Sequence, residues 1–180
     1  IAHAHAGGAW VHVDGAFGLW AGAVPALAHH VAGVEQADSV ATDAHKWLNV
    51  PYDSGIALVK DGEALRAAMA VTASYLPTAS EERNPSDYTP ELSRRARGVD
   101  VWAVLSSLGK EGVAAMIGGT CDHARRFAEG LGAAGFDILN DVVLNQVLVS
   151  FGTPERTHRV IAAVQEEGTC WAGPTLWQGK

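Results

Sequence analysis

Cysteine, charge and long apolar runs are all scarce in this sequence of 180 residues. The two cysteines, Cys121 and Cys170, lie far apart and match no metal-ligand spacing, which favours a reducing compartment over a disulfide scaffold and predicts a cytoplasmic location. Charged residues make up 18% of the chain and the net charge is -7, so we expect no nucleic acid partner. No apolar run reaches the length of a membrane span, so we expect no membrane partner either.

Apolar residues are plentiful by contrast, at 48% of the sequence, and they predict a packed core rather than disorder. The sequence begins at Ile1 rather than at a methionine, and neither end has a polar tail. We therefore expect the chain to be an interior piece of a longer protein.

Strand-like and helix-like segments alternate in the first part of the chain. Short, apolar or β-branched runs predict strands, and longer apolar segments beside turn residues predict helices. We expect strands over residues 9–13, 38–42 and 55–59, and helices over residues 25–34 and 62–70, the second capped by Asp61. This alternation predicts an α/β fold with a parallel sheet and helical crossovers.

The chain changes character after the third expected strand. Residues 72–90 are rich in proline and polar residues and predict a long surface loop, of a kind that is often functional. A smaller α+β part is expected from about residue 110. A helix is expected over residues 94–108, before this part. Within it we expect helices over 112–131 and 154–167 and strands over 136–139, 142–151 and 169–172.

Two charged residues stand at the ends of neighbouring expected strands. Asp14 ends the first strand, and Lys46 follows the second by a few residues. A right-handed crossover brings both to the carboxyl edge of one parallel sheet, where ligands bind in open α/β folds. A lysine that forms an imine and an acid that pairs with a pyridinium nitrogen suit pyridoxal phosphate (PLP). Taken singly, each has a simpler explanation, because a strand-end aspartate often caps a turn and a lysine is often a solvated surface residue.

Residues 12–17 and 38–51, with the His45-Lys46-Trp47 core, resemble the group II PLP-dependent amino acid decarboxylases. This family includes the glutamate, aromatic L-amino acid, tyrosine and cysteine sulfinate decarboxylases. The resemblance implies fold type I, the PLP cofactor, a small-molecule amino acid substrate and a homodimer with its active site at the subunit interface. It assigns residues 1–110 to the C-terminal half of the PLP-binding large domain and residues 111–180 to part of the small C-terminal domain.

The resemblance also assigns roles to five residues. Lys46 resembles the lysine that forms the imine, and Asp14 resembles the partner of the pyridine nitrogen. Ala16 resembles the small residue packed against the ring, and His45 resembles the histidine near the phosphate and the substrate. Tyr75, in the proline-rich loop, resembles the tyrosine that protonates the α-carbon after carbon dioxide leaves, whereas a phenylalanine there shifts related enzymes toward oxidative deamination.

The expected activity is that of a carboxy-lyase, which removes the α-carboxylate of an L-amino acid through a Lys46 imine and a quinonoid intermediate. An aminotransferase, an aldehyde synthase and a catalytically inactive remnant remain open, and the isolated 180 residues are expected to be inactive. No metal site is expected, since His3 and His5 lack a third ligand in the sequence. Asp43 departs from the family, where a neutral asparagine is common near the phosphate. An acid there repels the phosphate unless it points away or meets a cation.

Overall fold

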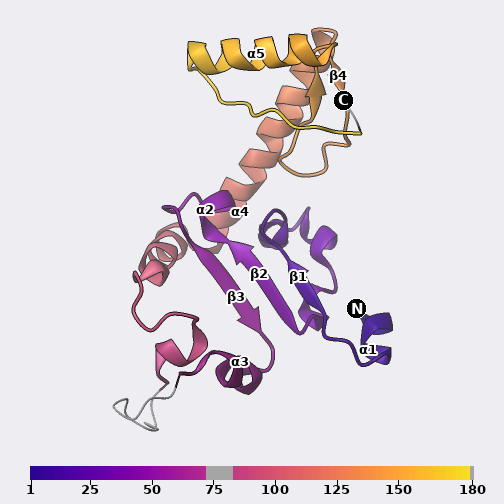
Figure 1. The fold of residues 1–180 in the computed structure, drawn as a ribbon. Helices are drawn as coiled ribbons and strands as arrows, with labels where there is room; N and C mark the ends of the chain where they lie inside the picture. Colours follow the sequence, from indigo (N-terminus) through magenta and orange to yellow (C-terminus); the bar gives the residue numbers. More distant parts are fainter. Residues whose placement is uncertain (72–82, 179–180) are drawn as a thin grey trace. The chain divides into compact units, whose positions relative to one another are not determined.

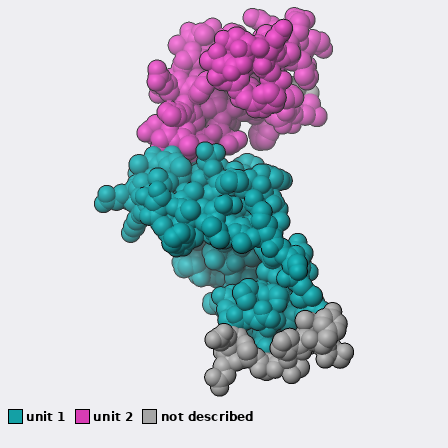
Figure 2. All heavy atoms as spheres, turned by 90° about the vertical axis from the view of Figure 1, so that its left-hand side faces the viewer, with its two compact units in different colours: residues 1–117 teal, residues 118–180 magenta. Residues whose placement is uncertain are grey.

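The computed structural model describes residues 1–71 and 83–178, and these form two compact units, residues 1–117 and 118–180. Figure 2 shows the two units in different colours. Tyr75, the expected proton donor, lies outside the described residues.

Unit 1 is built on a three-stranded sheet in the order β1-β2-β3 (Figure 1). The strands are β1 (His12–Asp14), β2 (Ser39–Asp43) and β3 (Gly55–Val59). β1 and β2 are parallel, as the sequence predicted, with Asp14 level with Ala41. β3 is antiparallel to β2, so the parallel pairing expected for the third strand is wrong. Only residues 44–54 join the two strands, and a parallel connection needs a crossover of a dozen or more residues.

The helix predicted over residues 25–34 is also wrong. Three short 3₁₀ helices take its place and extend beyond it, namely η1 (Leu19–Ala23), η2 (Ala28–Val31) and η3 (Val34–Gln36). Gly33 has a φ of 89°, a left-handed conformation that ends the helical run and that glycine adopts without strain. A Cβ on Gly22 would lie 3.1 Å from Val31 Cγ2, so the close approach of η1 and η2 also depends on a glycine.

Among the other short helices of unit 1, α3 is the one that the sequence predicted. α1 (Ala2–Ala6) precedes the sheet, and α2 (Ala44–Trp47) is a single turn directly after β2. α3 (Gly62–Met69) begins where expected, because Asp61 Oδ1 accepts hydrogen bonds of 3.0 Å from the backbone N–H groups of Glu63 and Ala64. η4 (Pro85–Tyr88) lies near the start of the described residues 83–178, within the segment predicted to be a long loop.

The long helix α4 (Arg97–Ala133) combines the two helices predicted over 94–108 and 112–131. It contains a break at Gly109, whose φ of 62° and ψ of -175° are not helical, so the prediction of two helical segments is confirmed. Its first turn starts three residues later than predicted. The boundary between the two compact units falls within its second segment, at residue 117.

Unit 2 continues with β4 (Asp137–Ile138), β5 (Val149–Ser150) and α5 (Pro154–Glu167). The two strands pair antiparallel but are much shorter than predicted. The side chain of Asn140 explains part of this, because it donates to the carbonyls of Asp141 and Gln146 and accepts from the N–H of Leu148, in place of a strand ladder.

Helix α5 matches its prediction at both ends. Thr153 caps the first turn through a 3.3 Å bond from the N–H of Arg156, Pro154 occupies the first helical position, and Gly168 ends the helix with a φ of 80°. The strand predicted over residues 169–172 is wrong, since this segment is irregular.

Buried residues concentrate around α2 in unit 1. Ala44, Trp47, Leu48 and Val50 are all at most 6% exposed. Packing on this short helix fixes its orientation at the end of β2, although four residues are too few for a stable isolated helix. The core therefore holds in place the segment that contains His45 and Lys46.

Candidate active site

The carboxyl ends of β1 and β2 are tied together by the backbone that follows Asp14. The N–H of Gly15 donates to the carbonyl of Ala41 at 2.7 Å, and the buried hydroxyl of Thr42 donates to the carbonyl of Gly15 at 3.1 Å. A Cβ on Gly15 would lie 2.8 Å from Leu19 Cβ, so only glycine allows this approach. The edge at which the sequence placed both Asp14 and Lys46 is thus a rigid junction.

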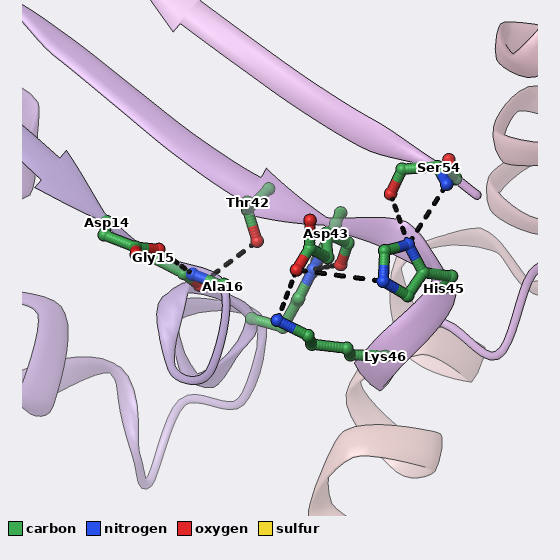
Figure 3. Close-up of polar contacts among 9 residues, drawn as sticks. Asp14, Gly15, Ala16, Thr42, Asp43, His45, Lys46 and Ser54 are labelled. Atoms are coloured by element: carbon green, nitrogen blue, oxygen red, sulfur yellow. Dashed lines mark hydrogen bonds and ion pairs between the residues drawn. The ribbon is translucent and has the colours of Figure 1, made fainter. Parts of the chain in front are cut away.

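Asp14 is exposed at the end of β1, and Ala16 is half-buried two residues later. One carboxylate oxygen of Asp14, Oδ1, accepts a 3.0 Å hydrogen bond from the N–H of Ala16 (Figure 3). With this hydrogen bond Asp14 caps the turn after β1, as strand-end aspartates often do without any role in ligand binding. A role in holding a ligand and a role in capping the turn therefore have to be separated by experiment.

Lys46 extends from α2 toward the segment that follows β1, as Figure 3 shows. Its Nζ lies 2.5 Å from Asp43 Oδ2 and 4.0 Å from the centre of the Phe17 ring. The ring face attracts the ammonium group, and the carboxylate pairs with it. Both contacts hold the amine on the side of the sheet edge where the Asp14 turn lies.

His45 is held by the loop that precedes β3. Its Nδ1 lies 3.0 Å from the N of Ser54 and 2.9 Å from the carbonyl oxygen of the same residue. That oxygen already accepts the N–H of Ala44 at 3.0 Å, whereas the N–H of Ser54, which is 1% exposed, needs an acceptor. The network therefore assigns Nδ1 as the acceptor and leaves the proton on Nε2.

The Asp43 carboxylate lies near two side chains of α2, those of His45 and Lys46. Its Oδ2 contacts Lys46 Nζ and lies 3.9 Å from Nε2 of His45. The carbonyl of Asp43 accepts a 3.2 Å hydrogen bond from the indole N–H of Trp20. The sequence left open whether Asp43 points away from the phosphate or meets a cation. The structure shows that it meets a cation, Lys46.

The segment between α2 and β3 is anchored to the start of α4. Arg97 Nε donates to Asp53 Oδ1 at 3.1 Å, and Arg95 donates to the carbonyl of Asp53 at 3.1 Å. The Arg97 guanidinium holds the pKa of Asp53 below its usual value, with a smaller contribution from backbone hydrogen bonding. Tyr52, beside it, packs against the His45 ring at 4.5 Å between centroids. This anchor thus supports the loop that orients His45.

The lowered pKa of Asp53 predicts a pH-dependent contribution to stability. Because the folded-state pKa lies below that of the unfolded chain, the stabilisation is present above about pH 4 and is lost as the pH falls through the folded-state value. Asp53→Asn is expected to lower the melting temperature of the full-length protein modestly at pH 7 and to have a vanishing effect toward pH 2. A difference in melting temperature that stays constant over this range would contradict the prediction.

A cavity of about 740 Å³ borders the Asp14 turn. Asp14, Gly15 and Phe17 line one part of it, and residues 30–34 and 36 line another. Its volume is in the range of small-molecule sites. Lys46 does not line it, but the Phe17 ring, which does, is the ring over which Lys46 Nζ lies. The sheet edge therefore offers a concave space next to the candidate residues.

The four predicted site residues that the structure describes form two pairs. Lys46 and His45 lie near the Asp43 carboxylate, and Asp14 and Ala16 form the turn after β1. The Phe17 ring, over which Lys46 Nζ lies, links the two pairs. Sequence reasoning missed the contributions of Phe17 and Ser54. Phe17 lies within the first motif, and an aromatic residue directly after Ala16 was an available signal. Ser54 acts through its backbone, for which the residue type gives no signal.

Comparison with known proteins supplies the family. Residues 3–152 match the family described as the pyridoxal-dependent decarboxylase conserved domain. The chain belongs to this family. Membership confirms the predicted group II assignment, the fold type I architecture and PLP as the family's cofactor. The roles of individual site residues are not decided by it.

Curated relatives include decarboxylases and an aldehyde synthase. A tyrosine decarboxylase of Papaver somniferum is 33% identical over 141 residues, 76% of this chain and 27% of that protein. An aromatic-L-amino-acid decarboxylase of Drosophila lebanonensis is 32% identical over 88% of this chain and 40% of that protein. A 4-hydroxyphenylacetaldehyde synthase of Rhodiola rosea is 34% identical over 67% of this chain and 24% of that protein. The chain thus spans well under half of these relatives' lengths.

Solved structures agree on the fold. Oryza sativa TDC with PLP and tryptamine superposes with a TM-score of 0.88 at 24% identity, over 98% of this chain and 40% of that chain. The Rhodiola rosea 4-hydroxyphenylacetaldehyde synthase superposes with a TM-score of 0.75 at 29% identity, over 93% of this chain and 36% of that chain. Among the described residues of this chain, none of the helices combines the length and the apolar character needed to cross a membrane.

Proposed function

We propose that the whole protein is a PLP-dependent decarboxylase that removes the α-carboxylate of an L-amino acid. The observation that carries this proposal is the meeting of the Lys46 amine and the Asp14 turn at one sheet edge, in a chain of the decarboxylase family. The residues present fit the cofactor, because the edge offers a primary amine for an aldehyde, a carboxylate for a pyridine nitrogen and a small side chain beside it.

When bound, PLP supplies an electron sink for the electron pair that the departing carboxylate leaves behind. Lys46 is the amine that holds the cofactor covalently and gives way to the substrate amine. Asp14, in its carboxylate form, holds a proton on the ring nitrogen at the carboxyl end of β1. Ala16 leaves room for a flat ring beside it, where a larger side chain would intrude.

His45 acts as an orienting donor in this proposal. Its Nδ1 is occupied by the N–H of Ser54, so only Nε2–H is available toward the site. A ring held at Nδ1 by the backbone of Ser54 loses little entropy when it binds a ligand. His45 is therefore suited to donate a hydrogen bond to an anionic group of the cofactor or the substrate.

The direct test uses the full-length protein with a panel of L-amino acids. Carbon dioxide and amine are measured together, and the protein is reduced with borohydride and analysed by mass spectrometry for PLP attached to Lys46. Equal amounts of both products and a label on Lys46 support the proposal. A full-length protein that takes up no PLP favours the inactive remnant instead.

An aldehyde synthase is the second candidate. Relatives named 4-hydroxyphenylacetaldehyde synthase and phenylacetaldehyde synthase match this chain at 34% and 31% identity. The predicted proton donor Tyr75 separates the two activities, since a decarboxylase returns a proton to the α-carbon and an aldehyde synthase does not. The tyrosine at this position favours decarboxylation.

Tyr75→Phe is expected to keep PLP attachment and carbon dioxide release but to slow amine formation about a hundredfold or more, because it removes a general acid. Molecular oxygen is then the oxidant for the unprotonated carbon, and water releases the aldehyde and ammonia, with hydrogen peroxide as the reduced product. Amine, aldehyde and peroxide are assayed together. An unaltered rate and yield of amine would move the proton donor to water or to His45.

The proposal also covers the protein's cellular location, its oligomeric state and its domain boundaries. We propose a cytoplasmic homodimer with its active site at the subunit interface, and no nucleic acid or membrane partner. We assign residues 1–110 to the large PLP-binding domain and residues 111–180 to the small C-terminal domain. The 180 residues alone are expected to be inactive, because the chain spans only 24–40% of the curated relatives described above. Sedimentation of the full-length protein and assay of the isolated chain test these points.

A further inference from the structure

Asp43 occupies a position where an aspartate ordinarily has another task. It is the N-cap residue of α2, and N-cap aspartates usually accept a hydrogen bond from a backbone N–H in the first turn. The side chain of Asp43 makes no such capping bond. Its carboxylate instead reaches Lys46 Nζ, one turn further along, at 2.5 Å. The carboxylate is thus committed to the amine rather than to the helix.

The geometry around Asp43 holds its carboxylate at this place. The Trp20 indole bonds to its carbonyl, and the N–H of Ala44, the next residue, bonds to the carbonyl of Ser54. His45 Nε2, which bears the proton in the assigned tautomer, lies 3.9 Å from the same Oδ2 that pairs with Lys46. The side chain of Asp43 is only 24% exposed, so water screens the pair less than it would a fully exposed one.

We propose that Asp43 is a further catalytic residue, the counter-ion that keeps the Lys46 nitrogen protonated after this nitrogen has bonded to the aldehyde carbon of the cofactor. The Lys46 ammonium group begins with three protons. Two of them leave with the aldehyde oxygen as water when the C=N bond forms, and the third stays on the nitrogen. The positive charge next to Asp43 is therefore the same before and after the bond forms, and no oxidant or reductant is needed.

The retained charge has a chemical consequence. A protonated nitrogen draws electrons from the carbon bonded to it, so the amine of the substrate attacks this carbon more readily. The proton also stays available when Lys46 is released. This role rests on the proposed function, because it requires Lys46 to be the residue that holds the cofactor. It assigns to Asp43 the favourable charge interaction that the neutral asparagine of the resembled family lacks.

The test is a spectroscopic pH titration of the full-length protein loaded with PLP. Protonated and unprotonated forms of a C=N bond to PLP absorb at different wavelengths, so their ratio against pH gives a midpoint without any assay of turnover. Asp43→Asn is expected to move this midpoint downward by about one pH unit or more, since an opposite charge at contact distance shifts a titration by that amount. Asp122→Asn is the matched control, because it removes an exposed aspartate that pairs with Arg125 three residues away in unit 2. Its midpoint should equal that of the wild type.

The outcomes separate the two proposals. If the wild-type protein shows no borohydride-trapped PLP on Lys46, the proposed function fails and this inference fails with it. If the wild type is labelled but Asp43→Asn titrates with the wild-type midpoint, only the counter-ion role is overturned. Should Asp43→Asn not fold by circular dichroism, Asp43→Ser replaces it. Serine also removes the negative charge, and an unchanged midpoint would again overturn the proposal.

Discussion

Lys46→Ala is expected to lower turnover of the full-length protein at least about a thousandfold, because it removes the amine that holds the cofactor. The same change also removes an ion pair with Asp43 and a contact with the Phe17 ring. A loss of activity in this variant alone could therefore reflect a disturbed site. Turnover is to be measured together with PLP content and a circular dichroism spectrum.

Lys46→Arg is the variant that separates these effects. A guanidinium keeps the positive charge, pairs with a carboxylate and stacks on an aromatic ring, but it does not form an imine with an aldehyde. We expect Lys46→Arg to fold like the wild type and to be as inactive as Lys46→Ala. Near-normal decarboxylation by Lys46→Arg, or a borohydride label on another lysine such as Lys60, would show that the assignment of Lys46 is wrong.

The part of the site that the sequence predicted follows from strand geometry. β1 and β2 are short and parallel, and residues that follow the ends of parallel strands meet at one edge of the sheet. This rule predicts from the sequence that Asp14 and Lys46 lie at the same edge. Local rules were equally informative for α3, whose first turn is capped by Asp61, and for α5, which begins at Pro154.

Other features depend on contacts that a single sequence does not encode in its periodicity. The apolar segment after Pro25 forms 3₁₀ turns instead of a helix, because Gly33 adopts a left-handed conformation and Gly22 packs against Val31. The direction of β3 was predicted wrongly, because alternation of strands and helices does not reveal that α2 is too short for a crossover. Both errors arise from tertiary geometry rather than from composition.

The ion pair of Asp43 is another contact that the sequence alone could not predict. From the sequence, an acid near a phosphate looked unfavourable unless it pointed away or met a cation. The choice depended on one side-chain direction, which the structure supplies by placing Lys46 Nζ against Asp43 Oδ2. Asp43, which departs from the family pattern, is thereby the ion-pair partner of Lys46.

The effect of changing Asp14 depends on which of its two roles matters. If Asp14 only caps the turn after β1, Asp14→Asn should behave like the wild type, because an amide oxygen still accepts the hydrogen bond from the N–H of Ala16. If its charge holds a proton on the ring nitrogen, Asp14→Asn should lose function although the turn is intact. Asp14→Ala removes both the charge and the acceptor, so it reports the sum of the two roles.

We expect turnover of Asp14→Asn to fall about a hundredfold or more, as for other groups placed to stabilise developing charge. A charge-assisted hydrogen bond contributes about 1.5–3 kcal/mol, so PLP affinity should weaken as well. Saturating PLP should restore cofactor content but not turnover, because the bound ring then lacks the carboxylate that keeps its nitrogen protonated. Turnover is measured at several PLP concentrations, with melting temperature as the measure of the turn. Wild-type turnover in Asp14→Asn, with a loss confined to Asp14→Ala, would reduce Asp14 to a turn residue and leave the ring nitrogen without a partner in this chain.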